Sequence, residues 1–334
     1  MEARQVDELP HGAGWQYEPK WDGFRCLAIR AGRRIDVVGR SGKSLARYFP
    51  DVVAALAALP PKRFIIDGEL VIPVGNSLSF EALQLRLHPA ETRVRKLAAE
   101  TPAMLIAFDI LQTPDGKDLA AKPLVERRPA LEQFFASLDD GAGLRLSPAT
   151  RRRGEASKWL ARAGGGELDG VVAKRLDEPY RAGERAMLKI KCLRTADCVV
   201  GGFRYATDSR LVGSLLLGLY NEAGLLDHVG FTSAIAGSAR ETLTRKLEAL
   251  RGGPGFTGDA PGGPSRWSTE RSAQWEPLKP KLVVEVQYDH VTGGRFRHGT
   301  RLVRWRPDKM PKQCTFEQLQ REATPSRLMR RIFA

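Results

Sequence analysis

The chain has 334 residues, of which 42% are hydrophobic, and it carries a formal net charge of +14. This length allows one large domain or two ordinary ones, each with a packed core. The charge favours a polyanionic partner such as nucleic acid, with a general preference for arginine as the alternative explanation, and it is not confined to a tail because residues 1–195 and 196–334 each carry +7.

Several classes of protein are excluded by what the sequence lacks. No C-x-x-C or H-E-x-x-H spacing occurs, which argues against a zinc ribbon or a metalloprotease-type zinc site. No apolar run reaches the length of a membrane-spanning helix, so no membrane association is expected. Scattered cysteines without a signal peptide indicate a reducing cytoplasm.

The first 195 residues predict an α+β domain. Short apolar runs around turn residues predict strands, and apolar residues at helical spacing predict helices. In chain order we expect a hairpin over 24–38, a helix over 48–59, a strand, a D-G turn and a second strand within 63–72, helices from 79 to 100, a buried strand over 104–111, a helix over 123–138, and strands over 168–175 and 186–192. The regular β-α alternation of a Rossmann domain is missing.

The pattern of predicted elements changes near residues 193–196. Closely spaced strand candidates follow at 197–205, 213–220 and 226–233, then an amphipathic helix at 239–251, a Gly- and Pro-rich loop at 252–265, and two strands within 282–291 and 300–307. Five or so short strands with one inserted helix predict a small OB-fold β-barrel. We therefore predict two domains, residues 1–195 and residues 196–334.

Lys20 lies in the polar stretch WQYEPKWDGFRC, residues 15–26. A lysine amine attacks electrophiles only when neutral, and because its reference pKa is about 10.4, burial or neighbouring cations must lower it. A solvated strand lysine is the ordinary alternative. The string K-W-D-G-F-R resembles K-x-D-G-x-R, the nucleotidyl-lysine motif of the covalent nucleotidyltransferase superfamily, which includes ATP-dependent DNA ligases, RNA ligases and mRNA capping enzymes.

Further motifs of this superfamily follow in the expected order. They resemble the S-R-x-G element, with Gly39 replacing serine before Arg40 and Gly42, the D-G-E element at Asp67–Glu69, the aromatic element at Phe108, E-G-V-V-x-K with Asp169 in the place of glutamate, K-x-K at Lys189 and Lys191, and R-x-D-K at Arg306–Lys309. A Walker A loop is excluded because position 37 is Val37 rather than glycine. The resemblance implies an ATP-grasp-like nucleotidyltransferase domain followed by an OB-fold domain.

Phosphoryl transfer needs cations and metals to converge on an anionic substrate. The resemblance implies that Lys20 attacks the α-phosphorus of ATP, expels pyrophosphate and carries AMP on its nitrogen. Lys189 and Lys191 are two residues apart on a predicted strand, so both side chains point to one face and can reach the α-phosphate. An exposed lysine pair is the alternative.

Two acidic residues are candidate metal ligands. Glu69 and Asp169 offer the oxygen ligands that Mg²⁺ prefers, with Mn²⁺ as the second candidate, and a bound ion would neutralise phosphate charge. Asp169 is one methylene shorter than the family's glutamate, so its metal contact can run through water. Glu69 can instead bind a ribose hydroxyl.

Four more residues are candidates for binding the nucleotide. Arg25 and Arg40 suit ribose and phosphate oxygens, because a guanidinium group matches pairs of oxygens. Phe108 offers a flat face to adenine, with core packing as the alternative. The resemblance implies that Glu18 contacts the edge of the base.

The R-x-D-K element falls in the predicted OB-fold domain. The resemblance implies that this domain closes over ATP and then over DNA, so Arg306 or Lys309 would orient the leaving pyrophosphate. Ordinary surface charge at a strand end is the alternative.

Nineteen residues precede Lys20, so no separate N-terminal DNA-binding domain is expected. The whole pattern is similar to minimal bacterial ATP-dependent DNA ligases of the actinobacterial C type. That resemblance implies a monomer that seals nicked double-stranded DNA in repair, with possible repair-protein partners. An RNA ligase, a GTP-using capping enzyme and a non-catalytic nucleic-acid-binding module remain the alternatives.

Overall fold

The computed structural model describes residues 1–334 apart from 76, 139–142, 164–167, 263–273 and 320–334. Its described residues form two compact units, Met1–Cys192 and Leu193–Glu322, and each is taken by itself below. The expected boundary after residue 195 would fall within β12 (Arg194–Tyr205), the first strand of the second unit.

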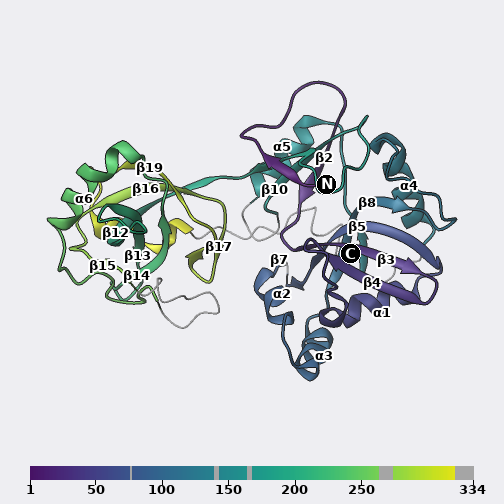
Figure 1. Cartoon of the computed structure of the whole chain (residues 1–334), viewed down its shortest axis with the longest axis horizontal. Helices are drawn as coiled ribbons and strands as arrows, with labels where there is room; N and C mark the ends of the chain where they lie inside the picture. Colours follow the sequence, from purple (N-terminus) through teal and green to yellow (C-terminus); the bar gives the residue numbers. More distant parts are fainter. Residues whose placement is uncertain (76, 139–142, 164–167, 263–273, 320–334) are drawn as a thin grey trace. The chain divides into compact units, whose positions relative to one another are not determined.

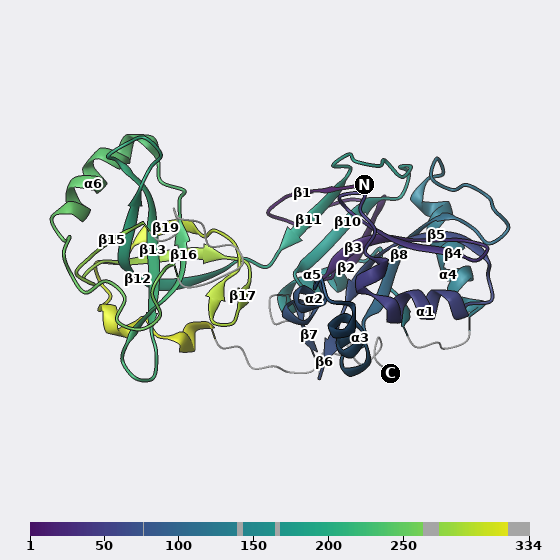
Figure 2. The ribbon, with the colours of Figure 1, turned by 60° about the horizontal axis from the view of Figure 1, so that its bottom comes forward.

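The N-terminal unit contains a four-stranded sheet in the order β1 (Ala3–Gln5), β11 (Met187–Lys191), β10 (Gly170–Arg175), β2 (Trp15–Lys20). β1 runs parallel to β11 and the other pairs are antiparallel. Figure 2 labels these four strands. Side chains alternate between the two faces of each strand. Tyr17, Val171 and Ile190 therefore pack on Ala156 of α5 (Arg153–Arg162), while the other face receives Glu18, Lys20, Lys189 and Lys191.

A second sheet in this unit has the order β4 (Arg34–Gly39), β3 (Phe24–Ala31), β5 (Arg63–Val71), β8 (Met104–Gln112), β9 (Leu144–Leu146). One face carries Ala28, Ile66 and Leu105, which form a core with apolar residues of α1 (Pro50–Ala58), α2 (Phe80–Arg86) and α4 (Leu124–Ala136). α3 (Glu91–Glu100) follows α2, and β6 (Pro73–Val74) pairs with β7 (Ser77–Leu78). Figure 1 shows these helices around the sheet.

The prediction of a turn at Asp67-Gly68 is wrong. β5 runs without interruption from Arg63 to Val71 and pairs with β3 on one side and β8 on the other. A β-carbon on Gly68 would lie 2.8 Å from the Ile106 carbonyl oxygen. Glycine is thus required here because the neighbouring strand approaches closely, and not because the chain turns.

The C-terminal unit is a small barrel. Its sheet has the order β14 (Leu226–Thr232), β13 (Val212–Tyr220), β12, β16 (Val283–Tyr288), β19 (Arg301–Trp305), and β15 (Glu276–Pro277) also pairs with β12. The two edges meet where Thr300 donates its N–H to Phe231 O at 3.0 Å and Thr232 Oγ1 donates to Thr300 O at 2.9 Å. α6 (Arg240–Glu248) packs on this core through Leu243 and Leu247. The predicted OB-fold is confirmed.

The sequence patterns found most elements and missed those without a strong local signal. The hairpin, α1, α4, α6 and the long strands are confirmed within a few residues. The patterns did not predict β1, β9, α5 or the short β17 (Val291–Thr292) and β18 (Arg295–Phe296) pair. In the part of the chain that the structure describes, no helix is long and apolar enough to cross a membrane.

Candidate active site

The candidate nucleophile, Lys20, is the last residue of β2, the edge strand that pairs with β10. Lys20 and Lys191 are both registered against Gly170 on β10, from its two sides. Glu18 and Lys189 are registered in the same way against Val172. Because residues directly opposite one another point to one face of a sheet, these four side chains share a face.

Asp169 joins the lysines of this face. Its Oδ2 lies 2.6 Å from Lys20 Nζ and 3.4 Å from Lys191 Nζ. The pKa of Lys189 is lowered, first by burial and then by the nearby ammonium groups of Lys191 and Lys20. The structure therefore brings the predicted Lys20, Lys189 and Lys191 together in one cationic cluster, in which Asp169 pairs with Lys20 and Lys191.

A glycine makes this convergence possible. Gly170 has φ +153° and a β-carbon there would lie 2.0 Å from the carbonyl oxygen of Ile190. No other residue fits between β2 and β11 at this point without moving the backbone. The D-G pair at 169–170 thus sets the spacing between Lys20 and Lys191.

Glu18 has a different environment from its neighbour Lys20. Its carboxylate pairs with Lys174 Nζ at 2.7 Å and accepts a hydrogen bond from Gln16 Nε2 at 2.7 Å. Both charged side chains of the pair are 3% exposed. A buried charge needs its partner, so Glu18 and Lys174 form a fixed polar pair under the site.

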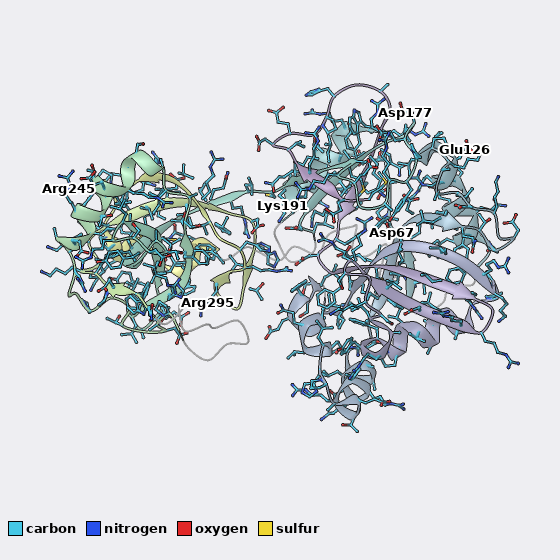
Figure 3. All side chains as sticks on the ribbon, viewed as in Figure 1. Asp67, Glu126, Asp177, Lys191, Arg245 and Arg295 are labelled. Atoms are coloured by element: carbon cyan, nitrogen blue, oxygen red, sulfur yellow. The ribbon has the colours of Figure 1, made fainter. Side chains whose placement is uncertain are left out.

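The second sheet presents its own polar face. Arg25, Asp67 and Glu69 alternate with the apolar residues of β3 and β5 and so point away from the helices. Arg25 binds Asp67 through two hydrogen bonds, of 3.0 and 2.6 Å, and Tyr180 Oη donates to the same carboxylate at 2.7 Å. Figure 3 labels Asp67 on this sheet and Lys191 on the other.

Phe108 is placed by a β-bulge. On β8 the register passes from Asp109, opposite Asp67, to Ala107, opposite Gly68, so Phe108 is the extra residue. Bulges re-aim side chains and are common beside active sites. Lys174 Nζ lies 4.7 Å and the Arg25 guanidinium carbon 5.5 Å from the ring centroid. Among the described residues Phe108 belongs to none of the apolar clusters.

Glu69 is the second candidate metal ligand. Burial raises the pKa of its carboxyl to about 8, against the opposing effects of Lys20 and Arg25. In the part of the chain that the structure describes, no hydrogen bond to this side chain is recorded, and no group of three potential metal ligands occurs. The carboxylate oxygens of Glu69 are the kind of ligand that a hard divalent cation prefers, with its remaining ligands taken from water and phosphate.

Gly23 brings the lysine motif against the second sheet. A β-carbon at Gly23 would lie 2.1 Å from the Leu70 carbonyl oxygen and 2.9 Å from Glu69 Cγ. The glycine of K-x-D-G-x-R therefore serves close packing of backbone on backbone. It joins the Lys20 strand to the strand that carries Glu69.

Arg40 lies at the edge of the site. It follows β4, its side chain is exposed, and its guanidinium is 3.4 Å from Glu2. Its charge is among those that lower the pKa of Lys189. Arg40 is thus close enough for its charge to act on the cluster.

Arg306 and Lys309 bind the same carboxylate, that of Asp197, within the C-terminal unit. Arg306 Nη1 donates to both Asp197 oxygens, at 2.9 and 3.0 Å, and Lys309 Nζ donates to Asp197 Oδ2 at 2.7 Å. Arg306 also holds Asp308 at 2.7 Å, and this hydrogen bond lowers the pKa of Asp308 to about 2. The R-x-D-K element is therefore an organised charge cluster rather than a set of independent surface charges.

The sequence analysis did not identify the residues that bind the motif side chains through hydrogen bonds and ion pairs. These are Asp197, which binds Arg306 and Lys309, Tyr180, which binds Asp67, and Arg127, whose guanidinium binds Asp109 through two hydrogen bonds of 2.8 and 3.0 Å. Arg127 belongs to the predicted helix 123–138, but its burial, which makes a carboxylate partner necessary, is seen only in the structure.

Two sheets whose polar faces carry the motif residues, followed by a barrel, are the architecture of a nucleotidyltransferase domain joined to an OB-fold domain. Comparison with known families assigns the class more closely. The family described as "ATP dependent DNA ligase domain" matches residues 3–191, and "ATP dependent DNA ligase C terminal region" matches residues 208–309. The chain belongs to the family of ATP-dependent DNA ligases.

Curated relatives of similar length support this assignment. The chain is 43% identical to DNA ligase C2 of Mycolicibacterium smegmatis, across 96% of this chain and 93% of that protein. It is 42% identical to DNA ligase C of Mycobacterium tuberculosis, across 98% of this chain and 94% of that protein. The resemblance to the actinobacterial C type is confirmed.

A solved structure from a study of Lig E DNA ligases has the same fold. It is 16% identical, with a TM-score of 0.57, and the match covers 92% of this chain and all of that chain. At this identity the likeness concerns the fold alone.

Proposed function

We propose that the protein seals nicks in duplex DNA through a covalent lysyl-AMP intermediate. The Lys20 nitrogen attacks the α-phosphorus of ATP, an N–P bond forms, and the P–O bond to pyrophosphate breaks. AMP then passes to the 5′-phosphate of the nick, and the 3′-hydroxyl displaces it to form the phosphodiester. The observation that carries this proposal is the convergence of Lys20, Lys189, Lys191 and Asp169 at one end of three adjacent strands, in a chain of the ATP-dependent DNA ligase family.

The cationic cluster is suited to the first step. A phosphorus under attack spreads negative charge over its oxygens, and preorganised cations stabilise that charge without reorganising. Lys189 and Lys191 point to the face that carries Lys20 and are the proposed contacts of the α-phosphate. The Lys20 ammonium pairs with Asp169, so attack requires the amine to lose a proton and leave this carboxylate.

The polar face of the second sheet is suited to the nucleoside. Phe108 is the proposed stacking partner of adenine, while Arg25 and Arg40 are the proposed contacts of ribose and phosphate oxygens. Glu18 is the proposed contact of the base edge. Its pairing with Lys174 fixes the position of its carboxylate.

Glu69 and Asp169 are the proposed ligands of Mg²⁺, or of Mn²⁺. Bound there, the ion would neutralise phosphate charge. Asp169 pairs with Lys20 at 2.6 Å, and the Lys20 ammonium group is close enough to Glu69 to oppose the rise in its pKa. Glu69 keeps the ribose 2′ or 3′ hydroxyl as its alternative partner.

The DNA contacts are proposed to come from the positively charged surfaces of both units, because residues 1–195 and 196–334 each carry +7. We assign the activity to DNA repair in the cytoplasm, by a monomer that works with repair proteins. We also propose that the first unit, Met1–Cys192, carries out adenylation, and that the OB-fold unit begins at Leu193, three residues before the start predicted from the sequence.

The test is transfer of label from ATP carrying ³²P at the α-phosphate. With Mg²⁺, the wild type should retain label after denaturation and release it as AMP when nicked duplex is added. Lys20→Ala should retain none. Lys158→Ala, which removes an exposed lysine on α5, is the matched control and should behave as the wild type.

Other outcomes discriminate the alternatives. Label taken from GTP instead of ATP would indicate a capping-type enzyme, and sealing of nicked RNA but not DNA would indicate an RNA ligase. No label from either nucleotide, even after pyrophosphate has removed any AMP already bound, would contradict the proposal and favour a binding module.

A further inference from the structure

Asp197 holds both cations of the R-x-D-K element. Its carboxylate accepts two hydrogen bonds from Arg306 Nη1 and one from Lys309 Nζ, all between 2.7 and 3.0 Å. The Asp197 side chain is 11% exposed and those of Arg306 and Lys309 are 20% and 23% exposed. Two cations that would otherwise repel one another thus share one nearly buried anion.

The backbone of Asp197 is held as well. Gln318 accepts a hydrogen bond from Asp197 N at 2.9 Å and donates one to Asp197 O at 3.1 Å. Gln318 therefore uses both ends of its amide on a single residue. This clamp keeps the carboxylate at one place near the start of β12.

The position of Asp197 is unfavourable when the cations are left out. In the sheet it lies directly opposite Glu285 on β16, and like charges in opposed positions of neighbouring strands destabilise a sheet. Arg304, on β19, pairs with Glu285 at 2.6 Å, which leaves Asp197 to be neutralised by Arg306 and Lys309. The repulsion between Asp197 and Glu285 is therefore offset by the ion pairs that Asp197 forms with Arg306 and Lys309.

We propose that Asp197 is a positioning residue for the adenylation step, which it serves by holding Arg306 and Lys309 side by side for the leaving pyrophosphate. This inference rests on the proposed function and on the contact with leaving pyrophosphate that the sequence resemblance implies for Arg306 or Lys309. Long arginine and lysine side chains lose considerable rotamer entropy when they are fixed. A carboxylate that fixes both before ATP binds removes that cost from the chemical step, which is the general advantage of preorganisation.

The test separates the first step from the last. Asp197→Asn keeps the shape of the side chain and removes its charge. Self-adenylation by ATP, which expels pyrophosphate, should slow by at least about tenfold, since misplaced groups readily cost this much. Sealing of a nick that already carries 5′-adenylate needs no pyrophosphate contact and should stay within about twofold of the wild type.

Two variants serve as controls. Glu276→Gln removes another carboxylate of the same unit, which binds Arg251 at 2.7 Å, and it should change neither step. Asp197→Glu should restore part of the adenylation rate because it restores the charge. Equal slowing of both steps by Asp197→Asn would show a merely structural role and overturn the proposal, as would an adenylation rate that is unchanged or increased.

A cycle of Asp197→Asn and Lys309→Met distinguishes failure of the inference from failure of the proposed function. If Asp197 holds Lys309, the double variant should lose less thermal stability than the two single losses together. Additive losses in Tm would contradict the contact. If the wild type forms no adenylate at all, the proposed function fails and the role of Asp197 in adenylation fails with it, whereas this cycle still decides whether the cations are held.

Discussion

Gly23 is the residue whose requirement can be argued most directly. The space for a β-carbon there is taken by the Leu70 carbonyl oxygen at 2.1 Å. Gly23→Ala must push β5 and the Lys20 segment apart, and overpacking of this kind costs about 1–3 kcal/mol. We expect a Tm lower by several degrees and slower self-adenylation, because Lys20 is three residues away. Thermal unfolding and label uptake measure the two effects.

Gly154→Ala is the control for that substitution. Gly154 lies within α5, and a β-carbon there would meet no atom within 4 Å. Alanine favours a helix over glycine by about 1 kcal/mol, so this variant should keep or slightly raise the Tm. If Gly23→Ala were as stable and as active as Gly154→Ala, the inference that β5 leaves no room for a β-carbon at position 23 would be contradicted.

At the scale of residues, the sequence predicted the charged residues of the candidate site but not the partners with which they form ion pairs. Lys189 and Lys191 could be placed on one face because side chains alternate along a strand. The partners Lys174 of Glu18 and Asp197 of Arg306 are far away in sequence. Such pairs depend on tertiary contacts, for which local patterns contain no information.

At the scale of elements, the D-G pair in β5 shows how a local signal can be overruled. Asp-Gly favours a hairpin turn, yet here both flanking strands hydrogen-bond across it. Glycine is needed because Leu105 and Ile106 of β8 approach closely. The same region carries the bulge at Phe108, which no pattern of apolar residues predicts since a bulge belongs to a pair of strands.

β14 carries a buried histidine with consequences for pH. His228 Nδ1 accepts a hydrogen bond from Arg295 Nη2 of β18 at 2.6 Å, and the imidazole packs on Phe256. Burial, followed by the charges of Arg295 and Arg204, lowers its pKa to about 3. The unfolded chain therefore binds a proton near pH 6.5 that the folded barrel does not. Stability is present above about pH 6.5 and is lost as pH falls toward 3.

This predicts that Tm falls between pH 7 and pH 4 more steeply in the wild type than in His228→Gln, which cannot titrate. Differential scanning calorimetry of the barrel's transition measures the difference. His298→Gln removes an exposed histidine of the same unit and should keep the wild-type slope. Equal slopes for wild type and His228→Gln would show that His228 is not held neutral.

At the scale of the whole molecule, the sequence allowed a two-part organisation to be predicted, because closely spaced strand candidates begin near residues 193–196. The order of the motifs placed the nucleotidyltransferase part first, and the family match to residues 3–191 agrees with it. The parallel pairing of β1 with β11 could not be predicted, since it joins two ends of the unit that are more than 180 residues apart.

The distribution of charge makes the steps of the reaction differ in their response to salt. Both sequence halves carry +7, so both should neutralise phosphates of a nicked duplex. With about six phosphate contacts, affinity should fall roughly a thousandfold between 50 and 200 mM salt. Adenylation of Lys20 involves a small nucleotide in a partly buried site, where screening is weaker, and should change much less. Fluorescence anisotropy with labelled nicked DNA, alongside label uptake at the same salt concentrations, measures both. A parallel decline of the two would indicate that salt acts on the fold rather than on a charged DNA-binding surface.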